Sequence, residues 1–524
     1  MDVIALPALT LALALSGSSG DSAAALSTAR TEIHPSGHQL HVPPGVEEIR
    51  VRDALRIPTA LGVFAGPDVL PIRVDIGRDS VSDWNNFGGN SERNGQTDVV
   101  GPTSDTLLWS NTDDYSIISW QPVTLAGRVF AIRESGFPQA GGAANDKLVA
   151  YDLDTGTELW SEVVPYAGDP DEEWIAYIGG ANDGKVYCAR GGSGRTTPIY
   201  AYDAATGVIV WTSTYETVAG PYGGFVFAPN GDLLVGDFDN IVRIDATDGS
   251  TVWSTPRLCP VSGTCGCAAS DDAVYIHTQA PGGQGQRIAR VNLDTGAIEY
   301  ESPIMPAGVI AQNMPFVSED GSTVYFARAS NSAPFDNLHA FSDDGTQFTE
   351  QWNREVRWTT RHVFGLADDG SIYAFLPGDE FARLSPADGS VVDTAGVLSP
   401  VADSLGPMTA ISANGTVYIS NGFASSPATN GRLWAYTADL STNLFTLNLD
   451  RQNTGGPVLA QNGTLIVADR TGVYAYRSPA PPCPEDLTGD DVVDASDLFQ
   501  LLGAWGACPG CPEDLTGDDA VDSD

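Results

Sequence analysis

A short pattern that recurs along most of this chain limits what it can fold into. From Tyr151 to Trp160 it reads as a strand, an Asp-x-x-Thr-Gly turn and a second strand that ends in a large aromatic residue. Further copies of this pattern end at Trp211, Trp253 and Tyr300, and weaker copies lie at 341–352, 384–392 and 436–445. Trp109, Trp160, Trp211 and Trp253 are 51, 51 and 42 residues apart. A sustained repeat of this length is typical of propeller blades.

Each repeat contains two glycine turns. The Thr-Gly or Asp-Gly turn supplies a residue that tolerates positive φ, as a tight hairpin between twisted strands requires. A second turn precedes each copy and is followed by an apolar strand: Asp183-Gly184, Asn230-Gly231, Asp320-Gly321, Asp369-Gly370, Asn414-Gly415 and Asn462-Gly463. Two hairpins per period predict a four-stranded blade, with the terminal tryptophan packed between neighbouring blades.

The repeats can be counted. Seven complete units are expected at 119–164, 174–215, 220–256, 264–303, 310–355, 361–398 and 404–449. A final unit at 453–477 lacks a closing strand, whereas residues 106–109 form an outer strand without a blade. Joining the two completes an eighth blade and leaves the ring without an open seam. The sequence therefore predicts an all-β, eight-bladed propeller over 84–477, closed by an N-terminal strand.

A stretch ahead of the repeats carries a family resemblance. Residues 84–90 read Trp-Asn-Asn-Phe-Gly-Gly-Asn, and 107–109 read Leu-Leu-Trp. Together with the Asp-x-x-Thr-Gly-x-x-x-Trp repeats, they resemble the PQQ-like propeller repeat proteins. The resemblance implies the eight-bladed fold. Quinoprotein dehydrogenases share that scaffold, so fold alone does not decide the function.

Charge and hydropathy restrict the partners and the location. The chain has 67 Asp and Glu against 26 Lys and Arg, a net charge of −41, which excludes nucleic acid as an expected partner. Residues 3–15 are apolar but too short for a membrane span, so 1–25 are expected to be a secretion signal although Asp2 stands where a basic residue is usual. We expect a secreted, extracellular or periplasmic protein without a transmembrane span.

The segment between signal and propeller gives little information. Residues 26–83 carry no repeat, and several prolines exclude a long helix. His34, His38 and His41 fall close together, but no Cys or acidic residue stands at ligand spacing, and exposed histidines in an extended segment are the expectation. We treat 26–83 as an extension of unknown structure.

The composition changes after a proline-rich linker at 478–482, where a calcium loop is expected. The expected side-chain ligands at loop positions 1, 3, 5, 9 and 12 are Asp486, Thr488, Asp490, Asp494 and Asp497. The Val492 carbonyl is expected at position 7. This spacing places hard oxygen atoms around one point, as Ca²⁺ requires. The same sequence begins again at Cys511, after an apolar-periodic helix over 498–505.

This module at 483–524 resembles a type I dockerin that is cut short in its second loop. The resemblance implies a cohesin-like protein or cell-surface scaffold as partner, contacted by Ala495 and Ser496 at loop positions 10 and 11. It departs from the pattern at Asp491, which stands where the loop usually has glycine. Since dockerins often accompany polysaccharide-degrading enzymes, a glycoside hydrolase-associated component is one alternative function.

A PQQ-dependent dehydrogenase is the other alternative, and the sequence gives it little support. An adjacent cysteine pair of the kind found over PQQ is absent, with Cys265-Gly266-Cys267 the nearest approach, and so is a Cys-x-x-Cys-His haem motif. No catalytic residue and no PQQ-binding residue can be assigned. The prediction is therefore a non-catalytic binding or scaffold propeller with calcium as its expected ion, whose propeller face binds a protein or glycan.

Overall fold

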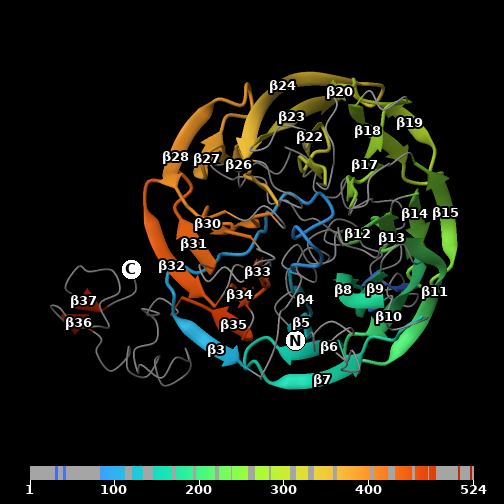
Figure 1. Ribbon diagram of the computed structural model, residues 1–524. Helices are drawn as coiled ribbons and strands as arrows, with labels where there is room; N and C mark the ends of the chain where they lie inside the picture. The colour runs from blue at the N-terminus through green and yellow to red at the C-terminus, as the bar shows by residue number, and fades with distance from the viewer. Residues whose placement is uncertain are drawn as a thin grey trace, which may run out of the picture.

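The protein forms a closed ring of β-sheets around a central channel (Figure 1). A computed structural model describes residues 30–33, 39–42, 83–112, 121–133, 146–167, 173–192, 196–218, 224–237, 239–257, 266–281, 285–306, 314–328, 335–357, 363–401, 406–422, 431–450, 455–469, 471–478, 506–507 and 520–521. In these residues the regular structure is entirely β. No helix of the described residues is long and apolar enough to cross a membrane.

The first four blades follow one another in chain order, each as an antiparallel four-stranded sheet with its first strand nearest the channel. Blade 1 contains β4 (Val123–Leu125), β5 (Arg128–Arg133), β6 (Lys147–Asp152) and β7 (Glu158–Val163). Blade 2 contains β8 (Glu173–Asn182), β9 (Lys185–Gly192), β10 (Thr196–Asp203) and β11 (Ile209–Val218). Blade 3 contains β12 (Val226–Phe227), β13 (Leu233–Gly236), β14 (Asn240–Ile244) and β15 (Thr251–Pro256). Blade 4 contains β16 (Ala268–Ala269), β17 (Ala273–Gln279), β18 (Gly285–Asn292) and β19 (Ile298–Glu301), with β20 (Met305–Pro306) paired to β18.

The next three blades repeat this order. Blade 5 contains β21 (Phe316–Val317), β22 (Thr323–Arg328), β23 (Phe335–Asp343) and β24 (Phe348–Arg357). Blade 6 contains β25 (Gly365–Leu366), β26 (Ile372–Leu376), β27 (Glu380–Leu384) and β28 (Val391–Val397). Blade 7 contains β29 (Thr409–Ile411), β30 (Val417–Ser420), β31 (Gly431–Tyr436) and β32 (Asn443–Leu449).

Blade 8 closes the ring with strands from both ends of the propeller. Its inner strands are β33 (Gly455–Leu459), β34 (Leu465–Ala468) and β35 (Val473–Tyr476), and its outer strand is β3 (Leu107–Asn111). Trp109 of β3 pairs with Ala475 of β35. The predicted eight-bladed architecture and its closure by an N-terminal strand are therefore confirmed.

A register shift recurs between the third and fourth strands of every blade. In blade 1 the register between β6 and β7 shifts by one residue between Tyr151↔Glu158 and Ala150↔Trp160. The third and fourth strands of every other blade contain a shift at the same place. A bulge re-aims the following side chain. The residue after the shift is aromatic in seven blades and is Asp393 in blade 6.

Tryptophan from one outer strand packs on the third turn of the next blade. The Trp160 indole Nε1 donates to the Ala204 carbonyl at 3.1 Å, and a side chain on Gly207 would lie 2.7 Å from the Trp160 ring. Trp109, Trp211, Trp253 and Trp352 make the equivalent contacts with Leu153 and Gly156, Ala246 and Gly249, Leu293 and Gly296, and Pro386 and Gly389. The predicted tryptophan packing between blades is confirmed at these five boundaries.

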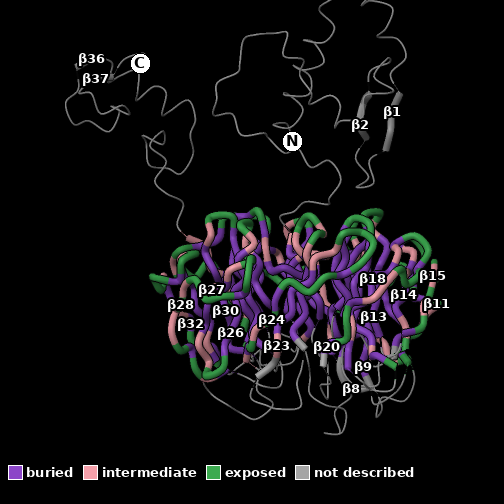
Figure 2. Tube along the Cα trace, turned by 90° about the horizontal axis from the view of Figure 1, so that it is seen from above, coloured by how far each residue is buried: buried purple, intermediate pink, exposed green. Residues whose placement is uncertain are grey.

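The core is divided among the blade boundaries. Seven of the hydrophobic clusters join strands of neighbouring blades, and the one around Trp84 and Leu459 joins blades 7, 8 and 1. Figure 2 shows buried residues through the depth of the ring and exposed residues at the turns of one face. Two small hairpins complete the described residues: β1 (Arg30–Ile33) with β2 (Gln39–Val42), and β36 (Gly506–Ala507) with β37 (Ala520–Val521).

Candidate functional site

One end of the channel is closed by residues 84–102, which we call the plug (Figure 1, blue segment). The plug accepts a hydrogen bond of 2.7–3.0 Å from the backbone N–H of one residue in each of seven successive inner strands. These donors, in order from blade 1 to blade 7, are Thr124, Ala181, Phe227, Ala269, Val317, Leu366 and Ile411. The plug therefore follows the ring round the channel, one blade after another.

The physical reason for this path is the free edge of each inner strand. The first strand of a blade has no partner on its channel side, so its N–H groups need another acceptor. Carbonyls of the plug meet six of these groups, among them Trp84 with Thr124 at 2.8 Å and Glu92 with Val317 at 2.9 Å. The Ser91 hydroxyl meets the seventh, on Phe227, at 3.0 Å.

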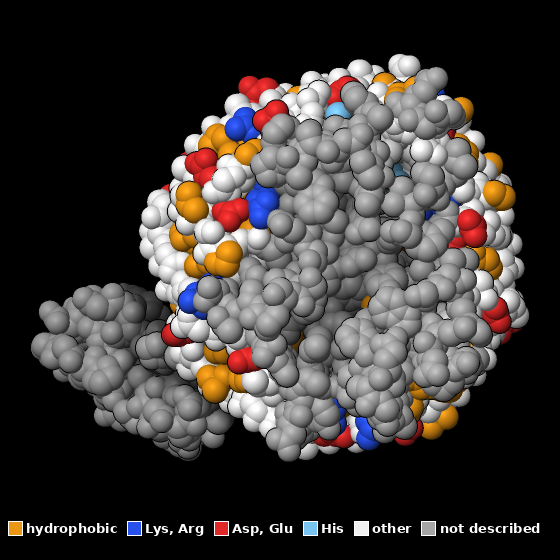
Figure 3. All heavy atoms as spheres, viewed as in Figure 1, with side chains coloured by type: hydrophobic (Ala, Val, Ile, Leu, Met, Phe, Trp, Pro, Cys, Tyr) orange, Lys and Arg blue, Asp and Glu red, His pale blue; other side chains and the backbone are white. Residues whose placement is uncertain are grey.

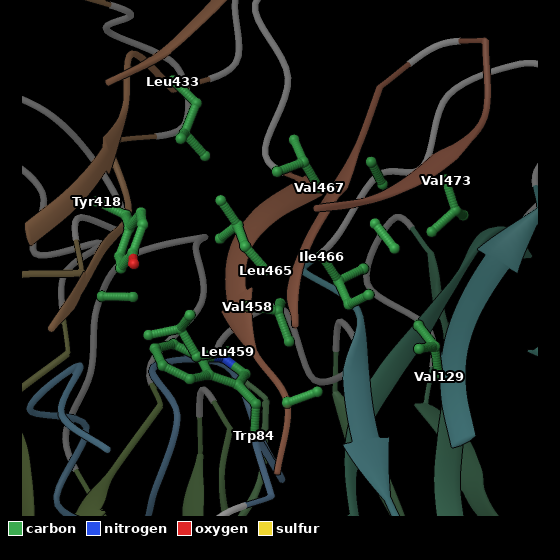
Figure 4. Packing of buried hydrophobic residues seen from close by; sticks show 14 of the residues in the cluster. Trp84, Val129, Tyr418, Leu433, Val458, Leu459, Leu465, Ile466, Val467 and Val473 are labelled. Carbon is green, nitrogen blue, oxygen red and sulfur yellow. The ribbon is translucent and has the colours of Figure 1, made fainter. Parts of the chain in front are cut away.

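Two glycines let the plug fold onto itself. Gly88 and Gly89 have φ of +105° and +97°, a region that disfavours residues with a side chain. A Cβ on Gly89 would lie 3.1 Å from the Trp84 ring, and one on Gly88 would lie 3.2 Å from Arg93. Figure 4 shows Trp84 beside Leu459 of blade 8, where it anchors the start of the plug.

An apolar layer lies inside the channel. Phe87 of the plug packs in one buried cluster with Tyr177 of blade 2, Met314 of blade 5, Val363 of blade 6 and Met408 of blade 7. Because these residues come from opposite sides of the ring, their side chains fill the channel at this level. The described part of the channel is thus a packed interior.

Arg93 supplies a buried cation next to this layer. Its guanidinium donates through Nε to the Cys267 carbonyl at 2.5 Å, through Nη1 to the Phe87 carbonyl at 2.5 Å and through Nη2 to the Gly224 carbonyl at 3.1 Å. Burial lowers the pKa of Arg93 to about 10, so the group stays charged at neutral pH. Arg93 therefore ties the plug to the inner strands of blades 3 and 4.

The plug also buries a polar side chain for which none of the described residues provides a hydrogen-bond partner. Asn86 is fully buried, and neither its amide nitrogen nor its amide oxygen has a hydrogen-bond partner in the described part of the chain. Its backbone pairs with Gly180 of blade 2. An unpaired buried amide costs about 1–3 kcal/mol, and a water molecule commonly removes that cost. Asn86 is therefore a buried polar group whose amide is not satisfied by the described residues.

The described channel does not fit PQQ. PQQ is a flat, anionic quinone, which needs an open slot and cationic or hydrogen-bonding partners. Phe87 and its apolar neighbours occupy the channel, and the three nitrogen atoms of Arg93 already donate to backbone carbonyls. No step through this cofactor follows from these residues.

Two buried histidines and a buried cysteine of the described ranges are engaged in packing. His277 stacks on Phe326 with ring centroids 5.4 Å apart, and His339 lies 2.9 Å from Glu350. Cys267 is buried with a free thiol, and burial raises its pKa to about 11, so it is a poor nucleophile at neutral pH. Within the ranges that the structure describes, no group of three or more His, Cys, Asp and Glu residues could hold a metal ion.

The calcium ligands predicted from the sequence lie outside the described residues. This holds for Asp486, Thr488, Asp490, Val492, Asp494 and Asp497, and for the predicted partner contacts Ala495 and Ser496. The structure instead draws attention to Asn86, Phe87 and Arg93. Sequence reasoning used their stretch only to mark the start of the propeller, although its dense Asn, Gly and aromatic content outside the repeat was a usable signal.

A family profile matches the propeller. The family is described as outer membrane protein assembly factor BamB, and its two matches, at 144–395 and 195–479, together cover well over half of the chain. No curated protein matches the sequence.

Solved structures share the fold at low identity. The Dos1 propeller has a TM-score of 0.51 at 9% identity, covering 73% of this chain and 98% of that one. BamB from Moraxella catarrhalis has a TM-score of 0.48 at 16% identity, covering 71% and 98%. Quinohemoprotein alcohol dehydrogenase from Comamonas testosteroni has a TM-score of 0.44 at 13% identity, covering 84% and 90%. At these identities the likeness concerns the fold alone.

Proposed function

The chain belongs to the family described as outer membrane protein assembly factor BamB, and from that premise we propose that it is a non-catalytic binding propeller of the periplasm or cell exterior. The observation that carries the proposal is the filled channel. Phe87 and the apolar residues of four blades occupy the place where a propeller enzyme would hold a small ligand. A protein or glycan partner bound on an outer face requires no such space.

The end of the channel opposite the plug is the better binding face. At the plug end, the turns between strands are short, such as the two residues between β4 and β5. At the other end, β5 stops at Arg133 and β6 begins at Lys147, and β30 stops at Ser420 while β31 begins at Gly431. Long connections are where propellers and other scaffolds place recognition residues. Figure 3 views this end, with acidic, basic and hydrophobic side chains interspersed along the rim.

A titration of metal-free protein with PQQ in millimolar Ca²⁺ tests the non-catalytic part of the proposal. We expect no stoichiometric binding and no dye-linked oxidation of simple alcohols or sugars. Quinone absorbance and dye reduction are the measurements. Tight binding with turnover would make the protein a quinoprotein dehydrogenase, and release of reducing sugar from a polysaccharide panel would make it a hydrolase-associated component.

We also propose that the tail attaches the propeller through a calcium loop. The spacing of Asp486, Thr488, Asp490, Asp494 and Asp497 supports it, since oxygen atoms at positions 1, 3, 5, 9 and 12 surround Ca²⁺ in such loops. In this proposal the Val492 carbonyl is a further ligand, and Ala495 and Ser496 face a cohesin-like protein or cell-surface scaffold.

Calorimetric titration of Ca²⁺ into the metal-free protein tests the loop. The test variant is Asp490→Ala. The matched control is Asp369→Ala, which changes an exposed turn residue of blade 6. We expect one site that is lost in Asp490→Ala and kept in the control. Equal binding in both variants would contradict the loop assignment.

A further inference from the structure

Blade 7 meets both of its neighbours without the tryptophan contact. At the register of the packed tryptophan, blade 6 has Asp393 and blade 7 has Phe445. Every other blade keeps a tryptophan of an outer strand on at least one side, such as Trp253 for blade 4 and Trp352 for blade 5. Among the described strands, blade 7 is therefore the blade that needs other directional contacts to hold its position in the ring.

Two tyrosine hydroxyls supply hydrogen bonds at these boundaries. Tyr373 of blade 6 donates to the Ala438 carbonyl at 2.6 Å, and Ala438 occupies the turn position that accepts the indole bond in other blades. Tyr418 of blade 7 donates to the Pro102 carbonyl, at the end of the plug, at 2.7 Å. The second of these bonds attaches blade 7 to the plug instead of to blade 8.

The inner strand of blade 7 is bound to the same part of the plug, residues 95–102, which we call the strap. The Ile411 N–H donates to the Gly95 carbonyl at 2.7 Å, and the Ile411 carbonyl accepts from the Thr97 N–H at 3.0 Å. The Ala413 N–H donates to the Val99 carbonyl at 2.9 Å. In blades 4, 5 and 6 a single backbone N–H of the inner strand region donates to the plug. The strap therefore runs along blade 7 and does not merely touch it.

Two glycines show how closely the strap lies on this blade. A Cβ on Gly95 would lie 2.6 Å from the Thr409 carbonyl oxygen, and a Cβ on Gly101 would lie 2.3 Å from the Tyr418 hydroxyl oxygen. Both distances are shorter than any ordinary van der Waals contact. The strap and blade 7 are thus fitted together without room for a side chain, so a shift of one requires a shift of the other.

We propose that the strap and blade 7 open and close as one unit, which makes them a conformational device at the plugged end of the channel. Apolar packing against blades 6 and 8 favours the closed state, and the hydrogen bonds to the strap set how often the blade loosens. Met408 of blade 7 belongs to the apolar layer of the channel, so opening would uncover that layer. This inference goes beyond the binding function proposed above and does not depend on it.

Hydrogen exchange of the full chain, followed by mass spectrometry, tests the coupling from the side of the blade. Tyr418→Phe removes the bond to the strap and keeps the ring, and Tyr325→Phe is the control, because this corresponding tyrosine of blade 5 packs on Trp352. Loss of one hydrogen bond should make exchange about tenfold faster in 95–102 and 409–420 in Tyr418→Phe, and leave both unchanged in the control. Faster exchange in only one of the two segments would overturn the proposal.

A second variant tests the coupling from the side of the strap. Gly95→Ala forces the strap away from Thr409, and Gly345→Ala is the control, since Gly345 also has a positive φ but has open space around it. Residues 431–449, the outer strands of blade 7, should exchange at least tenfold faster in Gly95→Ala and stay unchanged in Gly345→Ala. Faster exchange confined to the strap, or an equal increase in all eight blades, would show that blade 7 does not move with the strap.

Discussion

Neighbouring blades of this propeller are joined in two different ways. At five boundaries, from blade 8 to 1, 1 to 2, 2 to 3, 3 to 4 and 5 to 6, a tryptophan of one outer strand lies on a glycine turn of the next blade. The other three boundaries have Tyr300, Asp393 and Phe445 at the register of the tryptophan. The difference between these boundaries distinguishes the residues of the repeat that pack between blades from those that only form the turn.

Tryptophan and glycine occur as a pair. Where the tryptophan is present, the turn glycine has no room for a side chain, as at Gly207. Where it is absent, the constraint is lifted: Gly345, in the turn facing Tyr300, would place a Cβ with nothing within 4 Å. In the turn of blade 7 the positive φ, 57°, belongs to Leu440. In these turns, glycine is therefore required as much by the tryptophan ring that packs on it as by the positive φ of its own backbone.

The boundary between blades 4 and 5, which has no tryptophan, uses polar contacts instead. Between blades 4 and 5, the Tyr300 and Tyr275 hydroxyls both donate to the Asp343 carboxylate, and Arg290 pairs with Asp272, Glu299 and Asp343. Such a network is directional and depends on protonation, whereas the indole packing depends mainly on buried area. The two kinds of boundary should respond differently to mutation and to pH.

Removal of residues 84–110 should have the largest effect, because it deletes the plug and also Trp109, the packed tryptophan that precedes the repeats. Blade 8 would lose its outer strand, and seven inner-strand N–H groups would lose their acceptors. We expect an open ring that aggregates. Size-exclusion chromatography and thermal unfolding measure it, and a soluble monomer with cooperative unfolding would contradict the closure.

Replacement of a packed tryptophan should come next. Trp211 is buried and donates to the Ala246 carbonyl at 3.0 Å, so Trp211→Ala should cost about 3–5 kcal/mol of unfolding free energy. Asp393→Ala at the same register of blade 6 removes only a half-exposed pair with Arg383, and about 0–1 kcal/mol is expected. Urea unfolding compares them; equal losses would mean that the register position, and not the indole, holds the boundary.

The turn glycines provide a sharper comparison, since their φ values are alike. Gly207 and Gly345 have φ of +75° and +81°. Gly345→Ala should lose only the cost of a side chain in the left-handed region, about 1–2 kcal/mol. Gly207→Ala should lose about 1–3 kcal/mol more, because its Cβ would lie 2.7 Å from the Trp160 ring. Similar losses of unfolding free energy in both variants would show that contact with the tryptophan does not determine the need for glycine at this turn.

The repeat itself made most of this architecture predictable. The spacing of Trp109, Trp160 and Trp211 and the paired glycine turns gave the blade count and the closing strand, because both signals are local and recur. The copy ending at Val392 was less informative. The bulge that follows Val391 puts Asp393 at the tryptophan register, and a one-residue shift of this kind leaves no mark in composition.

The site was not predictable in the same way. Six of the seven plug acceptors are backbone carbonyls, and all seven donors are backbone N–H groups of the inner strands, neither of which depends on residue type; only the Ser91 hydroxyl is a side-chain acceptor in this set. The role of Arg93 depends on three carbonyls, two of them more than 130 residues away along the chain. The calcium loop, in contrast, is legible from spacing alone and stays a prediction because Asp486 to Asp497 lie outside the described residues.

Alkaline pH should distinguish the polar boundary between blades 4 and 5. Burial, and next the bond to Asp343, raise the pKa of Tyr300, so the folded state favours the neutral phenol. Its contribution is complete below the unfolded pKa of about 10 and is lost as pH rises above that value. Tyr300→Phe should therefore flatten the fall in stability between about pH 10 and 11. Denaturant unfolding at several pH values across this range measures the unfolding free energy. If its slope against pH were the same in Tyr300→Phe, Tyr300 would not contribute to the pH dependence of this boundary.

The smallest effect is expected at the boundary between blades 6 and 7, where the turn has neither the tryptophan nor the glycine. There the Asp439 carboxylate accepts from the Thr437 hydroxyl at 2.6 Å and from the Ser441 hydroxyl at 2.8 Å. These bonds lower the pKa of Asp439 to about 2, so its contribution is present above the unfolded pKa of about 4 and is lost as pH falls toward 2. A carboxyl titration followed by NMR should show this midpoint for Asp439, and Thr437→Val should move it upward. If the midpoint stayed near 4 in both proteins, the turn would be held by its backbone alone, and this boundary would need no substitute for the missing glycine.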